Sequence, residues 1–214
     1  MRKLSTSFLL VVALSLAAIP AMADVAYSNL GNPPSYNCCS GWTVGGVNSI
    51  VGLVRNAEQF TSAVSGEVSQ IDVGLGWVVG TDAATISLWT SVNDLPGMEL
   101  GSWGVSNMPV FGSTSTILTT ITGISGVHVD ANSQYFLVIE AADDAWEAWN
   151  WNDTGATGLL LQDSGNGWVQ FPDNTVGAFD VLTGGVAVPE PGTLVMLGSG
   201  VLAAAGAFRR KLNL

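Results

Sequence analysis

Histidine-dependent catalysis in this chain would have to use His128, because its 214 residues contain no other histidine. Asp130 follows two residues later, so on a strand the two side chains would share a face, as a nucleophile–histidine–carboxylate arrangement requires. No serine stands in the context of a nucleophile elbow. We therefore predict a solvent-facing His128 and no catalytic residues. The enzymatic alternative is a polysaccharide-acting enzyme with two facing carboxylates.

Acidic residues in expected loops indicate a second chemistry, the binding of calcium. Asp143, Asp144 and Asp153 are the candidate ligands, and an antiparallel sheet could bring their loops together. Carboxylate and carbonyl oxygens are the ligands that Ca²⁺ requires, about six to eight per ion. The sequence lacks the D-x-[DN]-x-[DN]-G loop of an EF-hand, so the alternative is a solvated acidic rim.

Three tryptophans close together indicate a third chemistry, the stacking of sugar rings. Trp146, Trp149 and Trp151 lie within six residues, and Trp149 and Trp151 share a strand face while Trp146 has the opposite parity. Exposed, they would form a carbohydrate-binding platform; buried, they would fill the core, as large aromatic side chains commonly do. For the tryptophans that stand singly we expect core packing: Trp42, Trp77, Trp89 and Trp103.

Cys38 and Cys39 are the only cysteines, and they are adjacent. Two ligands are too few for a structural zinc site, which needs about four. The sequence leaves open a disulfide between the neighbours or two unpaired thiols in a loop. Both alternatives are structural.

The charge of the central region excludes whole classes of partner. Between Asp24 and Val188 there are sixteen Asp or Glu residues and one cation, Arg55, a formal charge of −15. Such a domain has no basic surface for a phosphate backbone, so we predict no binding of nucleic acid. The same charge favours solubility and attracts cations.

The elements that would position these residues are strands. Alternation from Val68 to Trp77 points Ile71, Val73, Leu75 and Trp77 to one face. The same pattern marks Ile86, Leu88, Leu137 and Ile139 as core residues. Asn93–Gly97 predicts a turn, because Pro fixes φ and Gly tolerates positive φ. Roughly ten short strands separated by Gly, Asn or Asp predict an all-β, jelly-roll-like antiparallel β-sandwich, with the domain at 24–184.

The two ends of the chain carry targeting segments. Arg2 and Lys3 precede an apolar run, and Ala21-Met22-Ala23 has the pattern of a cleavage site, so residues 1–23 are predicted to be a secretory signal peptide. Residues 185–191 form a linker that includes Pro189-Glu190-Pro191. The apolar, uncharged residues 192–208 predict a single membrane-spanning helix within the segment 192–214.

Val188-Pro189-Glu190-Pro191, the apolar run and the basic end Arg209-Arg210-Lys211 together resemble the PEP-CTERM sorting signal of exported bacterial proteins. The resemblance implies export with signal peptidase and exosortase as processing partners. It also implies transient anchoring in the inner membrane and delivery to the cell surface or the extracellular space.

Residues 24–184 also resemble the choice-of-anchor R domain. The similarity begins at Tyr27–Gly31, Gly41–Val44 and Ala57–Thr61, and continues at Pro96–Leu100 with Ser102-Trp103, at Ala145–Asn150 and at Thr154–Gly158. It implies architecture and location only. We therefore expect a non-catalytic, exported all-β domain of the cell surface or biofilm matrix. The alternative is a carbohydrate-binding module, stabilised by calcium, that holds extracellular polysaccharide.

Overall fold

The computed structural model describes residues 23–184, and within them the chain forms fourteen β-strands and no helix. Each pair of hydrogen-bonded neighbouring strands is antiparallel. The predicted all-β antiparallel class is confirmed, with more strands than the expected ten. The strands are β1 (Asp24–Ser28), β2 (Gly41–Gly45), β3 (Arg55–Thr61), β4 (Gly66–Val73), β5 (Leu75–Val79), β6 (Ala83–Val92), β7 (Leu95–Ser106), β8 (Thr119–Thr122), β9 (His128–Val129), β10 (Gln134–Ala141), β11 (Trp146–Asn150), β12 (Thr157–Asp163), β13 (Val169–Thr175) and β14 (Phe179–Thr183).

The predicted signal peptide up to residue 22, the linker at 185–191 and the segment 192–214 lie outside the described residues. The predicted membrane-spanning helix at 192–208 belongs to that last segment. Among residues 23–184 no helix has the length and apolar character needed to cross a membrane.

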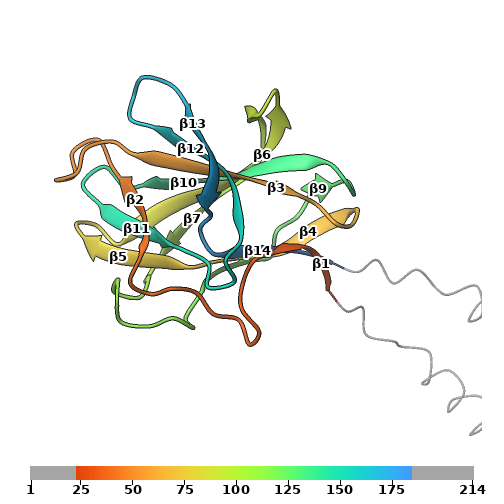
Figure 1. Ribbon diagram of the computed structural model, residues 1–214, viewed down its shortest axis with the longest axis horizontal. Coiled ribbons are helices and arrows are strands. Elements are labelled where there is room, and N and C mark those ends of the chain that lie inside the picture. The colour runs from red at the N-terminus through yellow and green to blue at the C-terminus, as the bar shows by residue number, and fades with distance from the viewer. Residues whose placement is uncertain (1–22, 185–214) are drawn as a thin grey trace, which may run out of the picture. The chain divides into compact units, whose positions relative to one another are not determined.

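The strands form three sheets (Figure 1). A six-stranded sheet has the order β13-β12-β3-β10-β6-β7, and a five-stranded sheet has the order β1-β14-β4-β8 with β9 paired to β4. A three-stranded sheet has the order β2-β11-β5. Most neighbours in these sheets are far apart in sequence, as when β3 lies between β10 and β12, so the fold depends on long-range pairing.

One apolar core joins the sheets. It receives Ile71 and Val73 from β4, Leu75 from β5, Ile86 and Leu88 from β6, and Leu137 and Ile139 from β10, all fully buried. These are the seven core positions that the period-2 patterns predict, and all seven are confirmed. Trp77, predicted on the same face, packs against this core and is partly buried.

β10 is buried on both faces, because one face meets the main core and the other belongs to a second apolar cluster. Leu137 and Ile139 enter the main core, while Phe136 and Val138 belong to a second apolar cluster with Ala57 and Leu161. Since successive side chains of a strand point to opposite faces, this second cluster lies on the side of the sheet away from the main core. A continuous apolar run is the pattern expected for such a strand.

The turn predicted at Asn93–Gly97 differs in detail in the structure. The β6–β7 turn is made by Asn93 and Asp94, with φ of 52° and 59°, whereas Gly97 lies inside β7. Two adjacent residues with positive φ match the right-handed twist of a hairpin, and Asn and Asp tolerate that conformation. Residues 80–82 connect two sheets, because β5 pairs with β11 whereas β6 pairs with β7 and β10.

Candidate functional site

The side of the six-stranded sheet away from the main core gathers aromatic, amide and charged side chains. We call it the outer face. It carries Arg55, Ala57 and Gln59 of β3, Ser87 and Trp89 of β6, Phe136, Val138 and Glu140 of β10, and Leu161 and Asp163 of β12. Strand alternation places these residues on one side, and the cross-strand register sets them beside one another.

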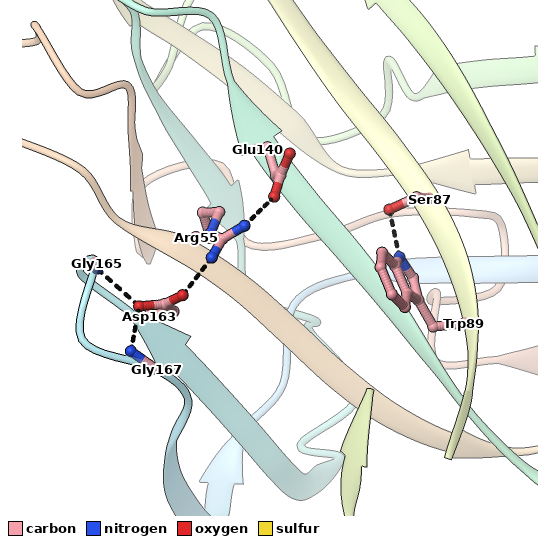
Figure 2. A network of polar contacts seen from close by, with 7 residues as sticks. All are labelled: Arg55, Ser87, Trp89, Glu140, Asp163, Gly165 and Gly167. Atoms are coloured by element: carbon pink, nitrogen blue, oxygen red, sulfur yellow. Dashed lines mark hydrogen bonds and ion pairs between the residues drawn. The ribbon is translucent and has the colours of Figure 1, made fainter. Parts of the chain in front are cut away.

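Arg55 is the centre of an ion-pair network on this face (Figure 2). Its Nη1 donates to Oε1 of Glu140 at 2.8 Å, and its Nη2 donates to Oδ2 of Asp163. The other oxygen of Asp163 accepts the backbone N–H groups of Gly165 and Gly167 at 2.7 and 3.0 Å. Burial would raise the pKa of Asp163, but these hydrogen bonds hold it below its ordinary value. Arg55 is thereby fixed in position.

Two tryptophans cover the second apolar cluster on the outer face. Trp89 and Trp168 are partly buried and pack against the cluster that contains Phe136, Val138 and Leu161. The indole N–H of Trp89 donates to Oγ of Ser87 at 2.7 Å (Figure 2), so the indole is tied to a residue of its own strand. The Arg55 guanidinium carbon lies 5.4 Å from the Trp168 ring centroid, within the range of a cation–π contact.

Amide side chains meet at the end of the outer face nearest the β6–β7 turn. Nε2 of Gln59 donates to Oγ of Ser91 at 2.9 Å and to Oδ1 of Asp94 at 3.0 Å. Gln134 donates to Oε1 of Gln59, and Gln170 of β13 donates to the backbone oxygen of Asp94. This polar end presents both donors and acceptors at the surface.

The predicted tryptophan cluster does not form a platform. Trp149 is fully buried, its indole N–H donates to the Ala178 oxygen at 3.2 Å, and its ring packs against Phe179. Trp151 is partly buried beside Trp42, with ring centroids 5.7 Å apart. Trp146 is also partly buried. Of the two alternatives that the sequence leaves open, the core is the observed one for Trp149, because β11 turns that side chain into the main core.

Trp89 lies on the outer face and not in the main core. It was expected in the core, but Ile86 and Leu88 occupy the core-facing positions of β6, and Trp89 has the opposite parity. The alternation that identified Ile86 and Leu88 was therefore the signal that could have assigned Trp89 to the outer face.

The three candidate calcium ligands lie in two turns, with Asp143 and Asp144 in one and Asp153 in the other. Asp143 and Asp144 stand between β10 and β11, where Oδ1 of Asp144 accepts the Thr81 N–H at 3.3 Å. Asp153 follows β11, and its Oδ2 accepts the Ser35 hydroxyl at 2.6 Å. Within residues 23–184, no group of three or more Asp, Glu, His or Cys side chains could hold a metal ion. The structure thus corrects the expectation that these loops meet.

The two cysteines and the histidine have structural surroundings. Cys38 and Cys39 are joined to each other by a disulfide, which is one of the two alternatives left by the sequence. His128 is half exposed, as predicted for a solvent-facing strand residue, and it lies 3.6 Å from a Glu67 oxygen and 3.5 Å from an Asp130 oxygen.

Two glutamates, Glu58 and Glu147, are fully buried, and the sequence does not predict this. Burial raises the pKa of Glu58 to about 8, although its Oε1 accepts the Gly177 N–H at 2.6 Å. Burial, reinforced by the charge of Asp82, also raises the pKa of Glu147 to about 8, and neither oxygen of Glu147 has a hydrogen-bond partner among the described residues. Only the fold reveals these groups, since nothing in the local sequence separates them from surface glutamates.

Asp72 and Asp180 face each other across β4 and β14. Burial and the neighbouring Asp72 raise the pKa of Asp180 to about 7. Asp72 is itself buried, and its two oxygens accept hydrogen bonds from Gln70 and Thr120. Each oxygen of Asp72 therefore already accepts one hydrogen bond within the domain.

A cavity of about 310 Å³ is lined by the end of β7 and the residues after it, 104–107 and Pro109, and by residues 117–120, which run into the start of β8. None of its lining residues is ionisable. This cavity therefore offers no acid, base or thiol to a bound molecule.

Comparison with protein families identifies residues 187–211 as a PEP-CTERM protein-sorting motif. This segment contains the Pro-Glu-Pro box and the basic end singled out in the sequence. Comparison with curated proteins finds no match. The motif indicates exosortase-dependent sorting of an exported protein to the cell surface.

Proposed function

We propose that residues 24–184 form a non-catalytic β-sandwich that the sorting system delivers to the cell surface or the extracellular matrix. The observation that carries this proposal is the PEP-CTERM motif at residues 187–211, directly after the last strand of the described domain. Signal peptidase would act after residue 23, and exosortase would act at the Pro-Glu-Pro box. The apolar residues 192–208 would anchor the chain in the inner membrane until then.

The arrangement of the sheets supports a jelly-roll-like sandwich. Strands of the five-stranded sheet contribute Ile71 and Val181 to the core, and strands of the six-stranded sheet contribute Leu88 and Leu137 to the same core. Two sheets that share one apolar interior in this way are the usual solution for an antiparallel all-β domain. The order of the sequence motifs from Tyr27–Gly31 to Thr154–Gly158 supports a choice-of-anchor R-like domain.

The surroundings of the ionisable groups support a non-catalytic role. His128 has carboxylates of Glu67 and Asp130 as its polar neighbours, Asp72 is occupied by Gln70 and Thr120, and the 310 Å³ cavity is lined by non-ionisable residues. A general acid or base must be within hydrogen-bond reach of a substrate, and these groups are already paired or are absent from the cavity.

Mass spectrometry of the protein from its native host tests the sorting. We expect an N-terminus at Asp24 and a C-terminus near Pro189–Gly192. Replacing both Pro189 and Pro191 with Ala should leave the C-terminal segment attached, whereas the control change Thr193→Ser should be processed normally. A secreted wild-type chain that still ends at Leu214 would contradict the proposal.

A further inference from the structure

We propose that the outer face of the six-stranded sheet binds a neutral polysaccharide chain, which would lie across β6, β10, β3 and β12 on Trp89 and Trp168. This inference rests on the proposed function, since it names the ligand of the exported domain. It differs from the sugar-binding alternative drawn from the sequence, because the residues involved are on another face of the fold.

The tryptophans of the outer face have the arrangement that stacking on a sugar needs. Each packs against the buried cluster of Phe136, Val138 and Leu161 and remains partly exposed. Trp89 is held by its hydrogen bond to Ser87, and Trp168 is held against Arg55. A sugar ring has an apolar face of C–H groups, which an indole fixed in position can cover at little cost in side-chain entropy.

The spacing of the two tryptophans fits a chain of sugars. Trp89 is on β6, and the Trp168 ring packs against Arg55 of β3, which is two inter-strand steps from β6 in the strand order. At about 4.8 Å a step, this is about 10 Å across the sheet. A single monosaccharide is too short to contact both rings, so the ligand that uses both is a saccharide chain.

Polar groups on the same face match the hydroxyl groups of a sugar. Gln59, Gln134 and Gln170 supply amide groups at the polar end, and Glu140, whose side chain is 40% exposed, supplies a carboxylate acceptor beside Arg55. A binding site that combines an apolar platform with a few oriented polar groups is typical of small-molecule and oligomer recognition. The amides fix the orientation of the chain and the indoles supply contact area.

The charge of the domain selects a neutral ligand. Arg55 is the one cation between Asp24 and Val188, and it is already paired with Glu140 and Asp163. A uronate or sulfated chain would meet a domain of formal charge −15 with no unpaired Arg or Lys in the described residues. Like-charge repulsion therefore disfavours anionic polysaccharides.

Affinity electrophoresis of the full chain tests the proposal, in a detergent whose headgroup is not a sugar. Each gel contains one polysaccharide. Three gels contain a neutral one, namely mixed-linkage β-glucan, mannan or dextran, and a fourth contains the anionic polysaccharide alginate. We expect at least one neutral polysaccharide to retard the wild-type protein and alginate to leave it unretarded. Trp89→Ala and Trp168→Ala should each weaken binding about tenfold or more, which corresponds to about 1.4 kcal/mol.

Matched variants separate binding from folding. Trp77→Ala removes a partly buried tryptophan from the three-stranded sheet and should bind like wild type. Trp89→Phe and Trp168→Phe keep an aromatic ring and should bind better than the Ala variants. If an Ala variant unfolds, the Phe variant at that position is compared with wild type instead. Thermal melting checks each fold.

Absence of retardation by all three neutral polysaccharides, or equal loss in the Trp77→Ala variant, would overturn the inference and leave the proposed sorting and non-catalytic role intact. Release of reducing sugar ends from a retarding polysaccharide would instead overturn the non-catalytic function. Retention of an unprocessed C-terminus in the native host would contradict sorting, whatever the gels show.

Discussion

Replacing Glu58 or Glu147 with Gln is expected to flatten the pH dependence of the domain's stability. Both carboxyl groups are fully buried, and burial raises the pKa of each to about 8. In the unfolded chain a glutamate has its ordinary pKa of about 4.3. Between these values the folded state holds a proton at each site that the unfolded state releases.

The sign of the effect follows from this difference in bound protons. The stability contributed by each protonated glutamate is fully present below the unfolded pKa and is lost as the pH rises towards the folded pKa of about 8. Each proton changes the free energy of unfolding by about 1.4 kcal/mol per pH unit, so from pH 5 to pH 7 each glutamate costs about 2–3 kcal/mol. The two together cost about 5 kcal/mol, a large part of a typical domain's stability.

Urea unfolding of residues 24–184, followed by tryptophan fluorescence at pH 5, 6, 7 and 8, measures this slope. Sodium chloride at about 0.5 M screens repulsion among the surface carboxylates but acts little on buried groups. Glu58→Gln and Glu147→Gln should each remove about a third of the loss between pH 5 and pH 7, because Asp180, whose pKa is raised to about 7, contributes a loss of the same sign. Glu99→Gln changes the net charge equally at an exposed position of β7 and should keep the wild-type slope.

A wild-type free energy of unfolding that stays constant or increases from pH 5 to pH 7 would refute the reasoning. So would a Glu58→Gln variant whose slope matches that of Glu99→Gln. In either case the two glutamates would be charged in the folded domain, and the burial of their side chains would have to be relieved by water or by a cation.

Three further outcomes are expected. Leu137→Ala, which empties a fully buried position of β10, should lower the free energy of unfolding by about 2–5 kcal/mol in urea titrations, and a neutral effect would contradict the core assignment. Arg55→Gln should lower the free energy of unfolding by about 1–3 kcal/mol, because Asp163 loses a charged hydrogen bond while nearly fully buried. Arg55→Lys should recover part of this stability, and two variants as stable as wild type would contradict the network. Calcium at 1 mM should raise the melting temperature no more than sodium chloride of matched ionic strength, and a calcium-specific rise that Asp143→Asn abolishes would show a metal site that the described residues do not reveal.

The strands and their buried faces could be predicted because a strand's side chains alternate with a period of two. Ile71, Val73 and Leu75 follow that period through a short segment, and no distant residue is needed to recognise it. The motif at residues 187–211 was equally accessible, since a sorting signal is recognised from consecutive residues.

The partners of Arg55 could not be predicted from the sequence. Glu140 and Asp163 are 85 and 108 residues away, and they reach Arg55 only because β3 lies between β10 and β12. Pairing of strands so distant depends on the packing of whole sheets, which local patterns do not encode.

The sequence by itself determined that this chain is an acidic, all-β protein with a sorting motif, because composition, alternation and a contiguous signal are local properties. Only the tertiary structure decided that Trp149 fills the core while Trp168 lies on the outer face, and that Glu58 and Glu147 are buried. The physical reason is that exposure depends on which sheet face another layer covers, and that layer comes from residues far away in the chain.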